Sequence, residues 1–365
     1  MPALSIEMNV LAITSGSSRF IASGAPFLFV SFHSYYGIIT ISMEIFLQIL
    51  ILIIGFVLLI KGADWLISGA SSVASNFKVS KQLIGLTIVA VGTGAPELAV
   101  SISSLAAGNT DMLIGNVMGS NIINILLLIG IAALIKPIRI KKNTIAKELP
   151  LLLLISTALV VLFLDMNITG ATNNDFSRSD AIICILFFAI FIYYIIQMTR
   201  KNRKSRNEVA KPQYKLGKSF LLVLIGLIGV VGGSQLVVNS ASTIAAAIGI
   251  SDRIIALSVV ALGTSLPELI TTVTAAKRNE NELLVGNIVG SNIFNICIVL
   301  GLPVVIFGTI TPESFEIIDI AMLIGSAVIL WLVTLTSSKI TRKEGALMLL
   351  IFAIYYSYLV YGALA

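Results

Sequence analysis

Charged residues, cysteine and histidine are all scarce in this chain of 365 residues. Charged side chains make up 12% of it and hydrophobic residues 57%, and the mean hydropathy is +1.01, so its apolar surface is too large for a soluble core. The two cysteines, Cys184 and Cys297, lie inside apolar runs, and His33 is the only histidine. These scarcities argue against a disulfide framework and against a metal site of cysteine and histidine. The composition instead predicts a multi-pass membrane protein.

The excess of basic residues does not indicate a nucleic-acid partner. The formal net charge is +6, but lysine and arginine gather in short loops between apolar runs. In a membrane protein, loops of this kind mark the cytoplasmic face. We therefore expect membrane lipid around the chain, no nucleic acid, and no obligatory protein partner.

Ten apolar segments follow Met43, each near the ~20 residues that a tilted helix needs to cross the hydrocarbon core. We therefore expect an all-α membrane protein with ten transmembrane helices. Their approximate limits are 44–70, 82–107, 112–135, 147–165, 180–199, 219–247, 254–276, 283–307, 317–336 and 344–363.

Basic residues between the segments orient the bundle. They concentrate between the third and fourth segments, the fifth and sixth, and the ninth and tenth, whereas acidic residues dominate the opposite loops. If the segments alternate, the positive-inside bias places Met43 outside and the basic loop 200–218 in the cytoplasm. Five segments precede this loop and five follow it. The two five-helix repeats, 43–199 and 219–365, are therefore inverted, as in many secondary transporters.

Residues 1–42 form an N-terminal extension with no counterpart in the second half. Its apolar run Phe20–Phe32 is short for a membrane span and contains Gly24 and Pro26. Three interpretations fit this extension: a signal-like or additional segment, a poorly ordered tail, or a start upstream of the natural one at Met43.

Two polar motifs occur twice in the chain. GTGAPE at 92–97 and GNVMGSNIIN at 115–124 return as GTSLPE at 263–268 and GNIVGSNIFN at 286–295. Every matched position differs by 171 residues, as in 268 − 97 and 295 − 124, which makes chance similarity a poor explanation. We infer that one five-helix unit has been duplicated.

In each copy of the shorter motif, a proline is followed directly by a glutamate. Pro96 and Pro267 have no N–H for the carbonyl four residues earlier, so each helix is expected to break there. Backbone carbonyls freed at membrane depth must be buried in protein or line a polar cavity. Glu97 and Glu268 follow the breaks directly. A charge at this depth costs at least ~2.5 kcal/mol to insert, which argues for a functional role.

Hydroxyl and amide side chains recur at helical spacing around these glutamates. Side chains four residues apart share one face of a helix. Four pairs have this spacing: Thr93 and Glu97, Ser120 and Asn124, Thr264 and Glu268, and Ser291 and Asn295. A set of hydroxyl, amide, carbonyl and carboxylate oxygens suits hard cations such as Ca²⁺ and Na⁺. Two carboxylates balance one divalent ion or two monovalent ions, as an exchanger of competing cations requires.

Close helix packing is the alternative role for the small and polar residues of GNxxGSN. Glycine, serine and asparagine often allow helices to approach and to form interhelical hydrogen bonds in membranes. This alternative applies most to the glycines of the motif, which are Gly115, Gly119, Gly286 and Gly290.

The paired GTSxPE and GNxxGSNIxN motifs resemble the alpha-repeats of the cation/calcium exchanger superfamily, and the chain most resembles its prokaryotic sodium/calcium exchangers. The resemblance covers roughly Met43 to Ala365. It implies a ten-helix fold, four central ion sites, and alternating access in which the helices of the first and sixth segments slide past a core. It also implies a set of ion ligands, with backbone carbonyls at the two alanines: Ala90, Thr93, Glu97, Ser120, Asn124, Ala261, Thr264, Ser265, Glu268, Ser291 and Asn295.

Two departures from the family pattern affect this ligand set. Gly94 stands where the family usually has serine, so the first half lacks one hydroxyl that Ser265 keeps in the second. Asn124 and Asn295 are both amides, whereas some members carry an aspartate at one of these places. With the two glutamates as the only acids, fewer groups can carry protons, which favours Na⁺ over H⁺ as the coupling ion.

We predict a secondary antiporter that exchanges Ca²⁺ for Na⁺ at a midplane site between Glu97 and Glu268. A Ca²⁺/H⁺ antiporter is the alternative from the same class, and a passive cation channel is the alternative from another class. We do not expect an enzyme, because the sequence has no evident nucleophile with a base partner, HExxH motif or phosphate-binding loop. We expect no cofactor beyond the transported ions.

Overall fold

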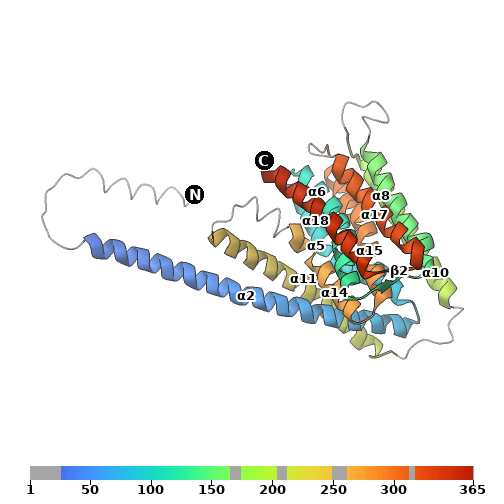
Figure 1. Cartoon of the computed structure of the whole chain (residues 1–365), viewed down its shortest axis with the longest axis horizontal. Helices are drawn as coiled ribbons and strands as arrows, with labels where there is room; N and C mark the ends of the chain where they lie inside the picture. Colours follow the sequence, from blue (N-terminus) through green and yellow to red (C-terminus); the bar gives the residue numbers. More distant parts are fainter. Residues whose placement is uncertain (1–25, 165–173, 204–211, 249–260, 312–316, 365) are drawn as a thin grey trace. The chain divides into compact units, whose positions relative to one another are not determined.

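The computed structural model describes residues 26–164, 174–203, 212–248, 261–311 and 317–364. The chain divides into two compact units, Met1–Leu47 and Gln48–Ala365, and the second unit holds both copies of the motifs. Within the described residues, eight helices are long and apolar enough to cross a membrane, and a bent pair forms a ninth (Figure 1). The predicted segment 254–276 is described only from Ala261 onward.

Most helices follow the predicted segments closely, two short strands occur in addition, and labels with η mark π-helical turns. The first half contains α2 (Pro26–Phe77), α3 (Lys81–Ile84), η1 (Gly85–Val89), α4 (Ala90–Thr93), α5 (Ala95–Ala106), α6 (Thr110–Ile122), η2 (Ile123–Leu128), α7 (Ile129–Ile135), β1 (Ile138–Arg139), η3 (Thr144–Glu148), α8 (Leu149–Phe163) and α10 (Arg178–Arg203). The second half contains α11 (Leu216–Ala247), α13 (Ala261–Thr264), α14 (Leu266–Lys277), α15 (Asn281–Phe294), η5 (Asn295–Leu300), α16 (Gly301–Phe307), α17 (Ile317–Ser337), β2 (Lys339–Ile340) and α18 (Arg342–Leu364).

Predicted and observed boundaries differ most in two regions. Helix α2 begins at Pro26 rather than at residue 44, so part of the extension 1–42 continues the first helix. Proline is favoured in the first turn of a helix, which explains this starting point. The loop predicted at 200–218 is shorter at both ends, because α10 continues to Arg203 and α11 starts at Leu216. Cations stabilise a helix C-terminus, so the basic residues after position 199 favour the longer α10.

The offset of 171 residues recurs in the structure. Helices α4 and α5 have the same bounds, after this shift, as α13 and α14. The succession α6, η2 and α7 matches α15, η5 and α16 to within one residue. The same positions in each half therefore adopt the same local structure, including a π-helical turn at Asn124 and at Asn295.

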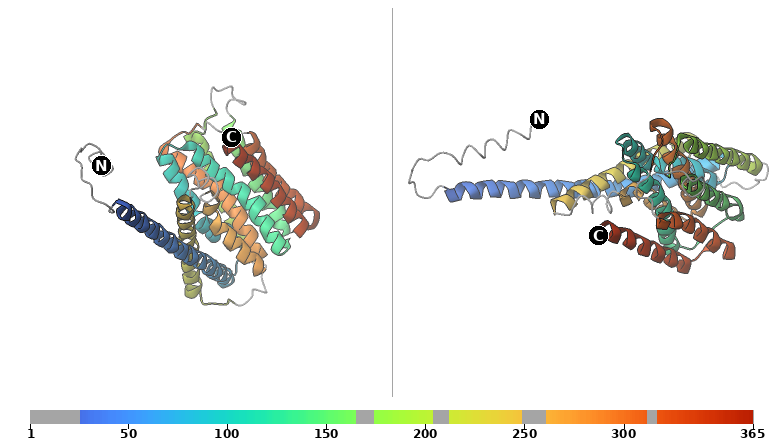
Figure 2. Two further views of the ribbon diagram at one scale, coloured as in Figure 1. Left: turned by 60° about the vertical axis from the view of Figure 1, so that its left-hand side comes forward. Right: turned by 90° about the horizontal axis from the view of Figure 1, so that it is seen from above.

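Helices α6 and α15 form the buried centre of the second unit. The buried share of the most apolar stretch is 83% in Asn281–Phe307 and 72% in Thr110–Ile135, against 17% in Ile45–Phe77. Figure 2 shows the two central helices beside each other, and they are in contact. The two spans that carry the GNxxGSNIxN motifs are thus the most buried of these eight spans.

The glycines of the motif have different roles in the two halves. A Cβ atom at Gly286 would lie 2.5 Å from the carbonyl oxygen of Gln82, and one at Gly290 would lie 2.7 Å from that of Leu86. These two glycines let α15 approach α3 and η1, as the packing alternative proposes. A Cβ atom at Gly115 or Gly119 would meet nothing within 4 Å among the described residues.

Helices α2 and α11 cross with their backbones in contact (Figure 1). A Cβ atom at Gly62 would lie 2.7 Å from the backbone nitrogen of Val230, and one at Gly69 would lie 2.8 Å from the carbonyl oxygen of Ser219. Only glycine allows such an approach. We call the contact between α2 and α11 at their glycines the glycine seam; its members are Gly55, Gly62, Gly69, Gly226, Gly229 and Gly233.

Two contacts join connecting segments between helices, one on each predicted face of the bundle. Strands β1 and β2 pair antiparallel, with Ile138 opposite Ile340, and so join two of the basic loops. A separate bridge joins Phe176 and Ile310, which lie in loops predicted on the other face.

Candidate cation-binding site

Glu97 and Glu268 lie in the first turn after two helix breaks. Gly94 separates α4 from α5 with φ −80° and ψ 3°, and Ser265 separates α13 from α14 with φ −86° and ψ 4°. The helices on either side of Gly94 are bent by 42°. Each proline occupies the first turn of the new helix, where the missing N–H disrupts no hydrogen bond. The helix breaks therefore occur where the prolines predict them.

Carbonyl groups at the breaks have protein partners. The carbonyl of Gly263 accepts a hydrogen bond of 2.9 Å from Oγ of Ser234 on α11. The carbonyl of Ala90, a predicted ligand, accepts from the N–H of Gly94 at 3.0 Å and from Oγ of Ser291 at 3.5 Å. A cation at Ala90 would therefore compete with the long hydrogen bond from Ser291. Ala261, the other predicted carbonyl ligand, is the first residue of α13.

The two glutamates occupy equivalent positions of the two halves and are both buried, with 1% of each residue exposed. Oε2 of each glutamate has no hydrogen-bond partner among the described residues. Two buried carboxylates with unpaired oxygens are unfavourable unless a cation or a proton compensates them.

Acceptor oxygens without partners gather among the predicted ligands. In the described part of the chain, eleven buried side-chain nitrogen or oxygen atoms lack a hydrogen-bond partner. The predicted ligands among them contribute oxygens only: Glu97 Oε2, Asn124 Oδ1, Ser265 Oγ, Glu268 Oε2 and Asn295 Oδ1. Carboxylate, amide and hydroxyl oxygens are the ligands of hard cations. The described residues contain no group of three or more His, Cys, Asp or Glu that could hold a metal, so the negative charge here comes from two carboxylates.

Asn124 and Asn295 both lie in π-helical turns and donate hydrogen bonds to the opposite half. Nδ2 of Asn124 donates to Oδ1 of Asn292, and Nδ2 of Asn295 donates to Oγ of Ser120, both at 2.9 Å. Their oxygens remain available. π-Helical turns are frequent at functional sites, because the extra residue moves a side chain out of the regular helical register.

Three asparagines of the site are absent from the predicted ligand set. Asn116 donates to the carbonyl of Glu97 at 3.0 Å, and Asn287 accepts from Thr93 at 3.4 Å. Asn292 accepts from Asn124. A signal for them exists in the sequence, since each GNxxGSNIxN motif has three asparagines and the prediction chose only the last.

A cavity of about 470 Å³ reaches two of the predicted ligands. Ser120 and Thr264 line it, together with Asn109 and Met112 near the start of α6 and Val360 near the end of α18. The cavity therefore extends from the candidate site toward one end of the helix bundle.

Comparisons with known proteins agree on one family. The family model for sodium/calcium exchanger proteins matches residues 47–197 and 218–361. The protein CaxA of Alkalimonas amylolytica is 38% identical over 85% of this chain and 98% of its own. The sodium/calcium exchanger MaX1 of Methanosarcina acetivorans is 30% identical over 86% of this chain and 98% of its own. A solved structure of the sodium-calcium exchanger NCX_Mj is similar with a TM-score of 0.75 and 32% identity, covering 86% of this chain and 98% of that one.

Proposed function

Because the chain belongs to the sodium/calcium exchanger family, we propose that it exchanges Ca²⁺ for Na⁺ across the membrane by alternating access. The observation that carries this proposal is a pair of buried glutamates, Glu97 and Glu268, at equivalent positions of the two halves, each with an unpartnered oxygen. The relatives named as sodium/calcium exchangers support the choice of the two ions.

Ca²⁺ binds between the two glutamates, and hydroxyl and carbonyl oxygens complete its coordination. Na⁺ ions occupy overlapping and adjacent oxygen sites. The proposed ligands are Ala90, Thr93, Glu97, Ser120, Asn124, Ala261, Thr264, Ser265, Glu268, Ser291 and Asn295. An ion-free site leaves two buried carboxylates uncompensated, so the transporter changes conformation only when loaded, and this couples the two fluxes. If more than two Na⁺ replace one Ca²⁺, each exchange cycle moves net charge across the membrane. The membrane potential then changes the free energy of transport by ~2.3 kcal/mol per elementary charge and 100 mV.

The proposed topology has ten helices in two inverted five-helix repeats, with Met43 outside and loop 200–218 in the cytoplasm. The grouping of the turns supports it. Strands β1 and β2 join two basic loops that the proposal places in the cytoplasm. The bridge between Phe176 and Ile310 joins two loops that it places outside.

Ion fluxes in proteoliposomes test the function. Vesicles loaded with Na⁺ should accumulate radioactive Ca²⁺ when diluted into Na⁺-free buffer, and Glu97→Gln or Glu268→Gln should abolish this uptake. Uptake driven only by a pH gradient would identify a Ca²⁺/H⁺ antiporter. Uptake that ignores every counter-ion gradient would identify a channel.

A further inference from the structure

Asn292 on α15 connects the two halves through both ends of its side-chain amide. Nδ2 of Asn292 donates to the backbone carbonyl of Asn121 at 3.3 Å. Oδ1 of Asn292 accepts from Nδ2 of Asn124 at 2.9 Å. The side chain is completely buried, with 0% exposed. Both contacts reach from α15 to the end of α6 and to η2, so Asn292 belongs to the interface between the halves.

This series of hydrogen bonds has a defined direction. A backbone carbonyl can only accept, so the carbonyl of Asn121 holds Nδ2 of Asn292 on its side. Oδ1 of Asn292 then faces Asn124 and can accept only from its Nδ2. Oδ1 of Asn124, which is buried and has no partner in the described part of the chain, points away from Asn292. A flipped Asn124 amide would place two acceptor oxygens against each other.

A cation binds the oxygen of an amide and not its NH₂ group. We propose that Asn292 is a positioning residue, which holds the amide of Asn124 with its oxygen toward the transported cation. This rests on the proposed function, because it takes Asn124 as an ion ligand.

In the second half, a different partner orients Asn295, the residue equivalent to Asn124. Nδ2 of Asn295 donates to Ser120, whose hydroxyl donates in turn to the carbonyl of Val117 at 3.1 Å. The residue equivalent to Asn292 is Asn121, since 292 − 171 = 121. Its Nδ2 donates to the carbonyl of Val117 within its own helix, at 2.7 Å. Asn121 has the same chemistry and burial as Asn292, but its side chain holds no predicted ligand.

Calorimetric titration of the full-length protein with Ca²⁺ tests the proposal. Asn292→Ala should weaken Ca²⁺ binding by about 10- to 100-fold, the range typical of residues that orient metal ligands. In a double-mutant cycle with Asn124→Ala, the second substitution should add little, because the oriented oxygen is already gone. Additive losses would overturn the positioning role. Asn292→Leu, which keeps the volume of the side chain, should behave as Asn292→Ala does, and normal binding by it would also overturn the role.

Asn121→Ala is the matched control, because it removes a buried amide but keeps the backbone carbonyl that anchors Asn292. A loss of affinity as large as that of Asn292→Ala would contradict the proposal. If Asn124→Ala itself left Ca²⁺ binding unchanged, the ligand assignment would fail together with the positioning role. A loss in Asn124→Ala with none in Asn292→Ala would reject the positioning role alone.

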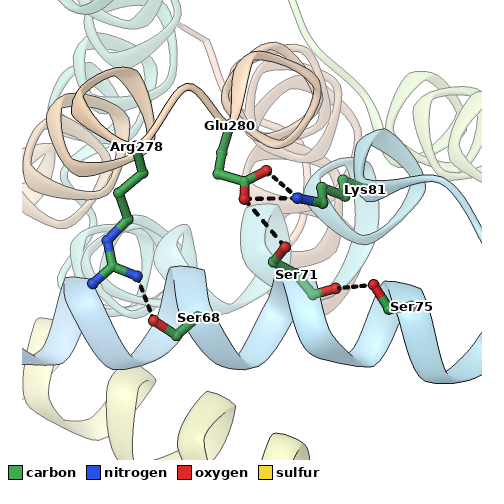
Figure 3. Close-up of polar contacts among 6 residues, drawn as sticks. All are labelled: Ser68, Ser71, Ser75, Lys81, Arg278 and Glu280. Carbon is green, nitrogen blue, oxygen red and sulfur yellow. Dashed lines mark hydrogen bonds and ion pairs between the residues drawn. The ribbon is translucent and has the colours of Figure 1, made fainter. Parts of the chain in front are cut away.

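A second, independent observation concerns the turn between α14 and α15 (Figure 3). Arg278 in this turn pairs with Asp64 of α2, with Nη2 and Oδ1 2.8 Å apart. It also donates a hydrogen bond to Ser68 of α2, which Figure 3 shows. Glu280 pairs with Lys81 at the start of α3, at 2.7 Å, and accepts a hydrogen bond of 3.2 Å from Ser71 of α2. The ion pair of Arg278 with Asp64 and the hydrogen bond from Ser71 to Glu280 therefore join α2, the moving helix of the proposed mechanism, to this turn.

The equivalent turn at the other end of the bundle lacks these charges. The 171-residue offset gives three pairs of equivalent positions: Asp64 and Gln235, Arg278 and Ala107, and Glu280 and Asn109. Asn109 instead caps α6 through the N–H of Met112, at 2.9 Å. The cavity that reaches Ser120 and Thr264 extends toward the end of the bundle at which this turn lies.

We infer that the contacts of Arg278 with Asp64 and of Glu280 with Ser71 form a latch, which favours the conformation closed at the α14–α15 turn. This rests on the proposed alternating access, in which α2 moves relative to this turn and both contacts must break. The ion pair of Arg278 with Asp64 is partly exposed to solvent. Loss of one partly exposed pair should change the ratio of the two conformations by about fivefold at most.

Exchange measured from each face of oriented vesicles tests the latch. Asp64→Asn should lower the half-saturating Ca²⁺ concentration at the cytoplasmic face, by up to about fivefold, and raise it at the other face. The exchanged pair Asp64→Arg with Arg278→Asp should restore both values, and Gln235→Ala is the control at the position equivalent to Asp64. Equal changes at both faces, or none, would overturn the latch. Absence of exchange in the unmodified protein would reject the proposed function instead.

Discussion

Gly94→Ser would restore the hydroxyl that the family pattern places in the first half. The structure predicts that this substitution, made alone, destabilises the protein. A Cβ atom at Gly94 would lie 3.0 Å from Cδ1 of Phe294 and 3.1 Å from the carbonyl oxygen of Ala90. Phe294 is 5% exposed and packs edge-on against Phe188, with ring centroids 6.1 Å apart. The ring therefore has little space into which it can move.

The expected cost of Gly94→Ser comes from crowding and not from the backbone. A φ of −80° is open to any residue, so serine is not strained there. Overpacking of a buried position costs about 1–3 kcal/mol. By the 171-residue offset, the equivalents of Gly94 and Phe294 are Ser265 and Ile123 (294 − 171 = 123), so the second half combines the serine with a smaller side chain. Gly94→Ser combined with Phe294→Ile should therefore be more stable than the sum of the single changes, by about 1–2 kcal/mol.

Chemical or thermal unfolding in detergent, with Na⁺ titration of the folded variants, checks this prediction. The double variant should bind Na⁺ more tightly than Phe294→Ile alone, because a hydroxyl has been added to the site. Ser265→Gly, which removes the equivalent hydroxyl, should weaken Na⁺ binding. Additive destabilisation would refute the role of Phe294 in crowding position 94. Unchanged Na⁺ binding by a folded double variant would refute the placement of this position beside the ions.

Three further predictions concern other parts of the molecule. Ser234→Ala should destabilise the fold by about 1–3 kcal/mol in unfolding experiments, because the buried carbonyl of Gly263 loses its hydrogen-bond donor. The control Ser326→Ala removes a hydrogen bond to Leu323 within one helix and should destabilise the fold less. Equal losses of stability in the two variants would contradict the argument. Gly62→Ala should lower the free energy of unfolding by about 1–3 kcal/mol or more, or prevent folding. The reason is that its Cβ atom would lie 2.7 Å from the backbone nitrogen of Val230. Gly232→Ala should be neutral or slightly stabilising by the same assay, because its Cβ meets nothing within 4 Å in the described residues, and similar losses in both variants would disprove the role of the close contact. Ca²⁺ at a hundred times its dissociation constant should stabilise the protein by about 2.7 kcal/mol in a thermal-shift assay. The Glu97→Gln variant should lose most of this stabilisation. Full stabilisation of the variant by Ca²⁺ would remove Glu97 from the ligand set.

The helix breaks could be predicted because their cause is local. A proline inside an apolar segment removes one particular hydrogen bond, and the structure places the breaks within three residues of Pro96 and Pro267. The limits of most helices were predictable to within a few residues because they depend on where apolar sequence ends. The boundary near residue 200 was harder to predict, since Arg200 is both a loop residue and a good last residue for a helix.

The contacts between asparagines could not be predicted, because they depend on which helices meet. Nothing in the sequence around Asn292 says that its neighbour is Asn124 rather than a residue of its own helix, as is the case for Asn121. The π-helical turns at positions 124 and 295 have no side-chain signature either. The relation between Gly94 and Phe294 joins positions 200 residues apart and becomes visible only through their contact.

The glycine seam has a consequence for the ancestry of the chain. A Cβ atom at Gly55 would lie 3.0 Å from the carbonyl oxygen of Gly233, and one at Gly62 would lie 3.0 Å from that of Gly226. The 171-residue offset converts each of these contacts into the other, because 55 + 171 = 226 and 62 + 171 = 233. Helix α2 thus packs against its own copy through the same surface, which is how the two subunits of a symmetric dimer meet. Two separate half-length chains could form this contact as well as one chain does, so the seam is compatible with a gene that arose by fusing the subunits of a dimer.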